Sequence, residues 1–272
     1  CFVSAVNKFL KKGKFNGSIS LLITGDEEGL AINGTKKVVD YLKKKKEKIN
    51  FCIVGEPTNP NRLGEMIKIG RRGSLTGKIE IYGTQGHVAY PHLSNNPINT
   101  LVSICKKLKE KKLDRGNKNF QPSNLEFTAI NVHNTAHNVI PSRARAQFNV
   151  RYNNFHNAST LKKKINSEVK SICRKNKCKF KIEFITNGDS FLTKPEKTIF
   201  MAKKIIKKIT KITPKFSTTG GTSDARFIRK IAPCLEFGLV NKTMHKVDEC
   251  VSLSDLKKLT KIYQNILEDY FR

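Results

Sequence analysis

The stretch that decides the fold is Ser18-Ile-Ser-Leu-Leu-Ile-Thr-Gly-Asp-Glu-Glu-Gly29. Residues 18–24 are rich in β-branched and aliphatic side chains and contain no breaker, so they predict a strand that ends at three carboxylates. The residues that follow predict a helix over 34–46 and a second apolar strand over 50–54. Strand, helix and strand with apolar strands are typical of a buried, largely parallel sheet in an α/β domain.

The rest of the chain shows two patterns of predicted elements. An amphipathic helix over residues 2–12 precedes the deciding stretch, and the α/β alternation returns after Pro195. The returning elements are a helix over 197–210, a Gly-rich turn over 218–222, a helix over 224–230, a strand over 234–239 and a last helix from Ser252, its expected N-cap, to Tyr270. The middle of the chain predicts strand, helix, strand, strand, helix and strand at 74–82, from 97, and at 125–132, 144–152, 158–173 and 179–186.

These two patterns predict two domains. Residues 1–72 and 190–272 are expected to form one α/β catalytic domain with a mixed sheet and helices on both faces. The order βαββαβ over residues 73–189 is that of an inserted α+β domain of the ferredoxin-like kind. An insertion of this length lies within ordinary domain size.

Composition limits the class of protein. A hydrophobic fraction of 38% supports a real core, and no apolar run reaches the roughly 18–20 residues that a spanning helix needs, so we expect no membrane partner. The seven cysteines are odd in number and scattered, which argues against a disulfide framework or a structural zinc site. We therefore expect a protein of a reducing cytoplasm.

The net charge of +30 admits two interpretations. Lysine and arginine neutralise phosphates, so the first is a nucleic-acid-binding protein. The second is drift toward lysine, whose codons are AT-rich, on solvated helix faces. We favour the second and expect no nucleic-acid partner, because the lysines spread over nearly every amphipathic segment and no nucleic-acid-binding motif accompanies them. A positive field would still help to recruit an anionic substrate.

Three segments that follow predicted strands carry candidate chemistry. The adjacent carboxylates of residues 26–28 repel one another, and a divalent cation would offset that repulsion. Glu56 precedes a proline that holds its backbone extended, and His245 follows the last predicted strand. Sites of open α/β sheets lie beyond the carboxyl ends of the strands, and zinc accepts Glu and His ligands when it keeps an open position. A solvated acidic turn and a lone surface histidine are the alternative interpretations.

Seven blocks of sequence follow one another in a recognisable order. They are Gly25-Asp-Glu-Glu-Gly29, Gly55-Glu-Pro-Thr58, Ile69-Gly-Arg-Arg-Gly-Ser-Leu-Thr-Gly77, Gln85-Gly-His-Val-Ala-Tyr-Pro-His92, Asn138-Val-Ile-Pro141, Gly220-Gly-Thr-Ser-Asp224 and Val240-Asn-Lys-Thr-Met-His-Lys-Val-Asp-Glu249. Over essentially all 272 residues the chain resembles bacterial succinyl-diaminopimelate desuccinylases, which belong to the dinuclear-zinc aminoacylase and carboxypeptidase superfamily. The resemblance implies a zinc-peptidase-like catalytic domain and an inserted domain that forms a homodimer.

The resemblance also implies roles for the residues that bear the chemistry. Glu27 is expected to be the general base and proton shuttle, which takes a proton from the attacking water and passes it to the leaving amine. Glu28 and Glu56 are expected to bind different metal ions, and His245 to share the metal of Glu28. Two Zn²⁺ ions are the expected cofactor, with Co²⁺ as the alternative. His87 is expected to reach the active site of a second copy and to help stabilise the tetrahedral oxyanion.

A further set of residues matches family positions that contact substrate. Arg71 is the expected carboxylate clamp, because a guanidinium binds a carboxylate through two parallel hydrogen bonds. The others are Ser74, Tyr90, Asn138, Gly221, Thr222 and Asn241. The substrate so implied is N-succinyl-LL-2,6-diaminopimelate, a succinylated diamino acid whose hydrolysis yields succinate and LL-2,6-diaminopimelate in bacterial lysine biosynthesis.

Three rival interpretations stay open. The first is a relative in the same superfamily that hydrolyses another N-acyl amino acid or a peptide. The second is a non-catalytic nucleic-acid-binding protein that uses the positive charge, and it requires binding that weakens steeply with salt. The third is a degenerate dimerisation scaffold without enzymatic activity.

Family members also carry a His-x-Asp segment that supplies a histidine to one metal and an aspartate to both. This sequence has no such segment, since its first histidine is His87, and we therefore expect an N-terminally truncated piece. The 272 residues alone should bind metal weakly and release no succinate from succinyl-diaminopimelate. An assay of succinate release by this chain with added Zn²⁺ tests the prediction, and ample metal-dependent activity would contradict it.

Overall fold

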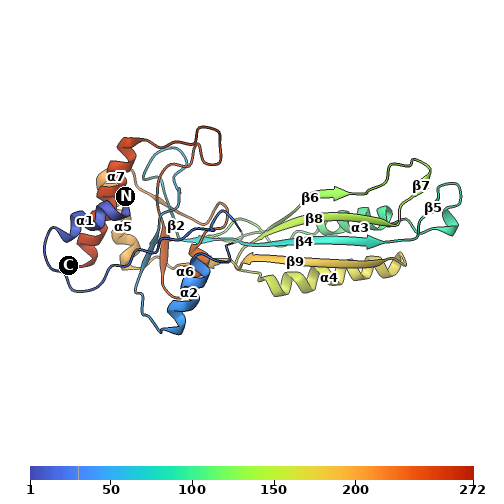
Figure 1. The fold of residues 1–272 in the computed structure, drawn as a ribbon, viewed down its shortest axis with the longest axis horizontal. Coiled ribbons are helices and arrows are strands. Elements are labelled where there is room, and N and C mark those ends of the chain that lie inside the picture. The colour runs from blue at the N-terminus through green and yellow to red at the C-terminus, as the bar shows by residue number, and fades with distance from the viewer. Residues whose placement is uncertain (30) are drawn as a thin grey trace. The chain divides into compact units, whose positions relative to one another are not determined.

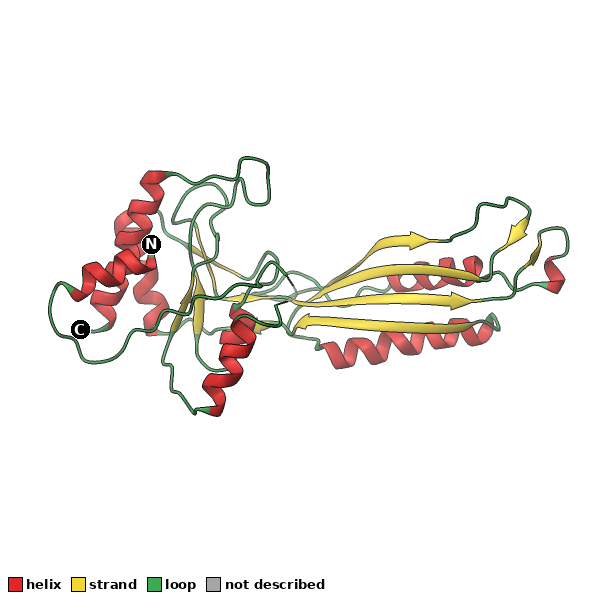
Figure 2. Cartoon of the chain, in the orientation of Figure 1, coloured by secondary structure: helices red, strands yellow, loops and turns green. Residues whose placement is uncertain are grey.

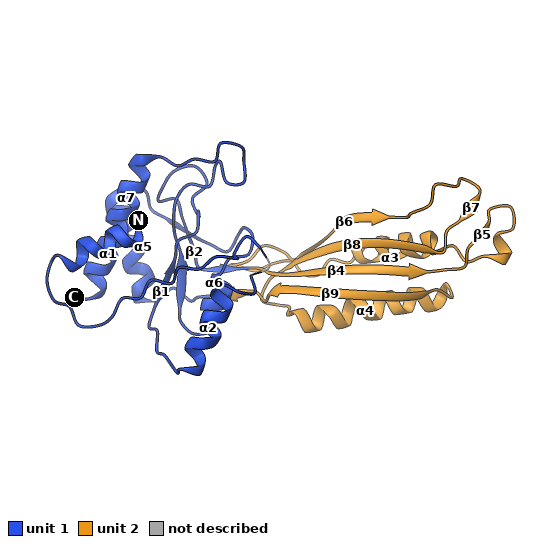
Figure 3. Cartoon of the chain, viewed as in Figure 1, with its two compact units in different colours: residues 1–71, 192–272 blue, residues 72–191 orange. Residues whose placement is uncertain are grey.

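The computed structural model describes residues 1–29 and 31–272, and these separate into two units (Figures 1 and 3). The first unit comprises Cys1–Arg71 and Leu192–Arg272, so its halves come from opposite ends of the chain. The second comprises Arg72–Phe191. Among the described helices, none has the length and apolar character that a bilayer crossing requires.

A mixed four-stranded sheet forms the centre of the first unit. Its strands are β1 (Cys52–Val54), β2 (Met66–Lys68), β11 (Lys215–Ser217) and β12 (Cys234–Glu236), in the order β1-β12-β2-β11. β1 lies parallel to β12 and β2 parallel to β11, whereas β12 and β2 run antiparallel. The mixed sheet expected from the sequence is therefore present. Two short strands, β3 (Gly70–Arg71) and β10 (Phe191–Leu192), lie outside it.

Helices cover both faces of this sheet (Figure 2). They are α1 (Phe2–Leu10), α2 (Thr35–Lys44), α5 (Lys197–Thr210), α6 (Ala225–Ile228) and α7 (Leu253–Tyr270). α1, α5 and α7 share one core with the strand residues Ile67 and Leu235, which are fully buried. α2 packs against α6 on the other side of the sheet (Figure 1).

Most predicted elements of this unit are confirmed, some at shorter length. α5 has the predicted bounds, and α7 begins after Ser252, whose hydroxyl accepts the N–H of Asp255 at 3.4 Å. The predicted helix over residues 224–230 shrinks to the single turn of α6.

The predicted strand over residues 18–24 is wrong, because these residues form no strand. Leu21, Leu22 and Ile23 expose 43%, 42% and 82% of their surfaces. A strand is stabilised by a hydrogen-bonded neighbour and by side chains buried on a sheet face. None of the described strands pairs with this segment, so its apolar pattern alone does not produce a strand.

The second unit is an antiparallel sheet with two helices. Its strands β4 (Gly73–Tyr82), β6 (Asn124–Asn131), β8 (Arg143–Tyr152) and β9 (Lys179–Gly188) lie in the order β6-β8-β4-β9. The helices α3 (Pro97–Glu110) and α4 (Ala158–Lys175) share the core of this sheet. The other elements are β5 (Gly86–His87), which pairs with β7 (Val139–Ile140), and a 3₁₀ turn, η1 (Pro91–Leu93).

One close contact in this core requires glycine. A Cβ atom on Gly77 would lie 2.1 Å from the ring of Phe148, its partner in the register of β4 and β8. The ring therefore occupies the space above the glycine, which holds the two long central strands close.

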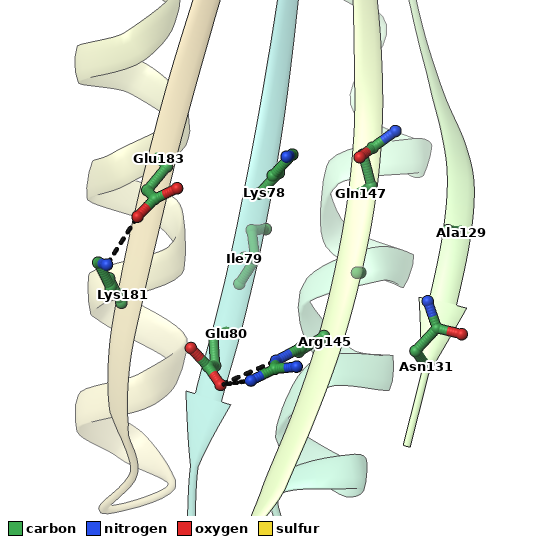
Figure 4. A pocket seen from close by; sticks show the side chains of 10 residues that line it. Lys78, Ile79, Glu80, Ala129, Asn131, Arg145, Gln147, Lys181 and Glu183 are labelled. Carbon is green, nitrogen blue, oxygen red and sulfur yellow. Dashed lines mark hydrogen bonds and ion pairs between the residues drawn. The ribbon is translucent and has the colours of Figure 1, made fainter. Parts of the chain in front are cut away.

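The outward face of the sheet is polar and carries a shallow hollow (Figure 4). Glu80 pairs with Arg145 at 2.8 Å, and Lys181 pairs with Glu183 at 2.6 Å. Opposite charges thus offset one another between the neighbouring strands β4 and β8 and along β9, as expected for a solvated sheet face.

Asp114 ties together the loop between α3 and β6 and the end of β8. Its carboxylate accepts the N–H of Gly116 at 2.7 Å, the amide of Asn153 at 2.7 Å and the N–H of Ser123 at 3.2 Å. His156 Nε2 lies 3.0 Å from its second oxygen. Burial would raise the pKa of Asp114, but these hydrogen bonds outweigh it and lower the pKa from 3.8 to about 2.

Replacing Asp114 by Asn should destabilise the chain by about 2 kcal/mol at neutral pH. The folded pKa is depressed, so the stabilisation is present above pH ~4 and is lost as pH falls toward about 2. Urea unfolding of wild type and Asp114→Asn at pH 7 and pH 3 measures this, with the exposed Asp40→Asn as the control. Equal stability of wild type and Asp114→Asn at pH 7 would contradict the prediction.

Candidate active site

An acidic loop in the first unit positions the first two candidate glutamates. The Asp26 carboxylate accepts the N–H groups of Ile32 and Asn33 at 2.7 and 2.8 Å, and its backbone adopts φ +67°. A Cβ on Gly34 would lie 2.2 Å from the carbonyl oxygen of Gly25, so only glycine closes the loop this tightly. Asp26 thus stabilises the loop, and Glu27 and Glu28 are the two adjacent acids that are candidates for catalysis and metal binding.

Glu27 and Glu56 lie close enough for their charges to interact. Burial, together with the charges of Glu236 and Glu27, raises the pKa of Glu56 to about 7. Burial also raises the pKa of Glu27, helped by the charges of Glu28 and Asp224. The structure therefore gathers carboxylates from four separate segments of the chain. Raised pKa values of this kind are typical of sites that hold a cation or transfer protons.

A buried ion pair lies beside these acids. The Arg71 Nε atom lies 3.0 and 2.9 Å from the two carboxylate oxygens of Glu236, and an Nη atom makes a further short contact. Arg71 is 8% and Glu236 1% exposed. Ser223 donates its hydroxyl to Glu236 at 2.7 Å, and the other Arg71 Nη donates to the carbonyl of Gly221 at 3.3 Å. Arg71, predicted as a substrate clamp, thus already binds a carboxylate of the chain itself.

A second buried cation supports the same loop. The Lys68 ammonium donates to the hydroxyls of Ser217 at 3.1 Å and Thr219 at 2.6 Å. Burial lowers the pKa of Lys68 to about 8, and the positive charge of Arg71 contributes. Arg71 also donates to the Thr219 carbonyl at 3.4 Å. Both cations therefore hold the segment that leads to the Gly-rich turn.

Three residues of this site were not predicted from the sequence: Lys68, Asp224 and Glu236. Glu236 and Lys68 each carried a signal, since each is a charged residue between apolar neighbours in a short strand. A charge at such a position is stable only with a partner. Asp224 ends the Gly220–Asp224 motif, for which the sequence predicted roles only at Gly221 and Thr222.

The remaining predicted residues of the first unit are His245, Asn241, Gly221 and Thr222. His245 sits in an exposed loop with φ +59°, and its backbone N–H donates to Glu249 at 3.2 Å. The Asn241 N–H donates to the carbonyl of Asn59 at 2.9 Å. Gly221 is exposed and Thr222 half-buried in the turn that Arg71 holds.

Four predicted residues belong to the second unit. His87 and Tyr90 are exposed near one another, with ring centroids 5.9 Å apart. The Asn138 carbonyl accepts the N–H of Val88 at 3.0 Å and so extends the pairing of β5 with β7. Ser74 is buried in β4 and its hydroxyl accepts the amide of Asn149 at 3.2 Å.

The acids of the first unit fit a divalent cation in charge and in donor type. Carboxylate oxygens are good ligands, and mutual repulsion among half-buried carboxylates falls when a cation lies between them. Within residues 1–29 and 31–272, no three Asp, Glu, His or Cys side chains stand close enough to enclose an ion. Glu28, Glu56 and His245 are the candidates that could approach one.

A family profile and two curated relatives match nearly the whole chain. The profile of peptidase family M20/M25/M40 matches residues 1–269. The chain is 68% identical over 271 residues to a succinyl-diaminopimelate desuccinylase of Pelagibacter ubique, covering 99% of this chain and 71% of that protein. It is 50% identical over 274 residues to the enzyme of that name in Methylobacterium radiotolerans, covering 100% of this chain and 70% of that one.

Solved structures share the fold. The aminopeptidase PepT of Bacillus cereus superposes with a TM-score of 0.81 at 17% identity, over 98% of this chain and 68% of that one. The metallo-carboxypeptidase Sso-CP2 of Sulfolobus solfataricus, from family M20, gives a TM-score of 0.74 at 18% identity, over 98% and 73%. At these identities the likeness concerns the fold alone.

Replacing Glu236 by Gln should destabilise the chain by about 3–5 kcal/mol, because it leaves the Arg71 charge buried without its counter-ion. The control is Glu126→Gln, which breaks a surface pair with Lys109 and should change stability little. Urea unfolding followed by circular dichroism compares the two variants. If Glu236→Gln unfolds at the wild-type urea concentration, the pair does not hold this loop.

Proposed function

This chain belongs to peptidase family M20/M25/M40, and from that membership we propose a specific amide hydrolysis. The reaction converts N-succinyl-LL-2,6-diaminopimelate and water to succinate and LL-2,6-diaminopimelate, a step of lysine biosynthesis. The observation that carries the proposal is the 68% identity to a succinyl-diaminopimelate desuccinylase over 99% of the chain. Identity at this level over 99% of the chain supports a shared substrate as well as a shared fold.

Glu27 is the general base in this proposal. It takes a proton from the attacking water and gives it to the leaving amine, so it must change its protonation state during each turnover. Its partial burial and its acidic neighbours raise its pKa, which favours proton uptake at neutral pH. Glu56, at a pKa of about 7, carries a charge that a bound cation would stabilise.

Two divalent metal ions complete the chemistry, with Zn²⁺ proposed and Co²⁺ as the alternative. Glu28, Glu56 and His245 would hold them. When bound, such ions polarise the amide carbonyl and lower the pKa of the attacking water. The grouping of acids around Glu27 supports this assignment, because their repulsion falls when a cation is present.

Seven residues are proposed to take part in substrate recognition. Arg71, Gly221, Thr222 and Asn241 belong to the first unit, and Ser74, Tyr90 and Asn138 to the second. The Arg71 guanidinium is already bound to Glu236 and also donates to the Gly221 carbonyl. We therefore propose that Arg71 contributes to binding of the succinyl carboxylate mainly by holding the turn at Gly221 in place.

We further propose that residues 73–189 form a ferredoxin-like domain through which two copies pair in the cytoplasm. The antiparallel order β6-β8-β4-β9 with two helices in one core supports this interpretation. The exposed position of His87 supports a role in the active site of the second copy, where it would stabilise the oxyanion.

Replacing Glu27 by Gln in the full-length protein should lower kcat by about 10²–10⁴-fold, because the amide cannot accept the proton. The Zn²⁺ content should stay at the wild-type level, since Glu27 is not a proposed ligand. Glu47→Gln, an exposed charge change in the same unit, is the matched control. Succinate release and metal content measure the two effects separately.

The substrate is tested in the same assay. Succinyl-diaminopimelate should be hydrolysed with a kcat/KM well above those for N-acetylornithine and for dipeptides. Preference for either of the other substrates would assign the protein to a different branch of its family. Full activity of Glu27→Gln would remove Glu27 as the base.

A further inference from the structure

Asp224 is a buried carboxylate without a hydrogen-bond donor. It is 9% exposed, and its buried Oδ1 atom has no partner among the described residues. It stands at the N-cap of α6, yet its side chain does not cap that helix. No ion pair among the described residues includes it, although burying an unpaired carboxylate is costly.

Asp224 lies within electrostatic range of the acidic site. Its negative charge acts on both Glu27 and Glu56, so it lies near each of them. Arg71 and Arg226, whose positive charges lower the pKa of Glu27, form no ion pair with Asp224. Arg71 donates to Glu236 and to loop carbonyls, and the Arg226 guanidinium lies over the Phe227 ring at 4.6 Å.

The backbone on either side of Asp224 is fixed. Before it, the Ser223 hydroxyl is bonded to Glu236 at 2.7 Å. After it, the N–H groups of Phe227 and Ile228 donate to the Asp224 carbonyl at 2.9 and 3.2 Å. The backbone that carries the buried carboxylate is therefore held in place.

A fixed, unpaired negative charge destabilises the protein without a cation and attracts a cation to the same place. We propose that Asp224 is a positioning residue for the divalent cation, whose fixed charge draws the ion toward the candidate ligands Glu28 and Glu56 without touching it. The inference rests on the proposed function, because it takes the metal from there. A residue with this role affects affinity for the ion from outside the ligand shell.

Two effects of opposite sign follow for Asp224→Asn, which keeps the shape and removes the charge. Zn²⁺ should bind about 10–100-fold more weakly, the range seen when residues just outside a ligand shell are changed. The metal-free protein should become more stable, with a Tm higher by about 2–4 °C, because an unpaired buried charge is gone. A merely structural residue would lower the Tm instead.

The experiment uses the full-length protein, stripped of metal with a chelator. Zn²⁺ affinity is measured by competition with a coloured chelator, and Tm by calorimetry of the metal-free protein. Asp40→Asn, which removes one exposed negative charge from α2, should change neither quantity. Asp224→Glu restores the charge and should recover part of the affinity.

The outcomes separate the inference from the proposed function. Wild-type Zn²⁺ affinity in Asp224→Asn, or a lower Tm of its metal-free form, overturns the inference and leaves the hydrolase intact. If the wild-type protein neither binds Zn²⁺ nor releases succinate, the proposed function fails and the inference falls with it. Weaker binding together with a higher metal-free Tm supports Asp224 in this role.

Discussion

The first unit depends on the buried pair of Arg71 and Glu236. Taking two charges out of water is repaid only when the geometry is good and the remaining donors and acceptors are satisfied. Ser223 and the carbonyls of Thr219 and Gly221 meet that requirement, so the pair fixes a whole loop and not only two side chains. That loop leads directly to Asp224, so the pair also helps to hold the backbone that carries this acid.

Glu27 and Glu56 keep raised pKa values in a chain with a net charge of +30. If the distant lysines dominated, their field would lower these pKa values. Exposed charges are screened over about 8 Å at physiological ionic strength, whereas burial and neighbouring carboxylates act at short range with little screening. Glu56 therefore responds to its burial and to the charges of Glu236 and Glu27, and Glu27 responds to its burial and to the charges of Glu28 and Asp224. Local environment, not net charge, decides the chemistry here.

Local sequence patterns predicted the helices and long strands well, because periodicity records which face of an element is buried. The position of Glu56 also followed from a local rule, since it comes directly after β1. The partners of buried charges could not be predicted in this way. Arg71 and Glu236 are 165 residues apart, and no local pattern links them. The wrong strand at residues 18–24 has the same origin, because pairing depends on a neighbour that the segment's own sequence does not specify.

Two residues that were not predicted from the sequence, Lys68 and Glu236, share one property: each is a buried charge whose desolvation cost is offset by a partner far away in the sequence. Lys68 is a cation in a strand between apolar neighbours, stabilised by hydroxyls about 150 residues away in sequence. Asp224 is different, because the described residues offer it no donor or counter-ion. Proteins keep such exceptions where function requires them, since a charge that is unsatisfied inside the folded chain remains free to act on a ligand. In this unit the paired charges, Arg71 with Glu236 and Lys68 with its hydroxyl partners, stabilise the loops around the acids. The unpaired carboxylate of Asp224 is the charge that remains to attract a cation.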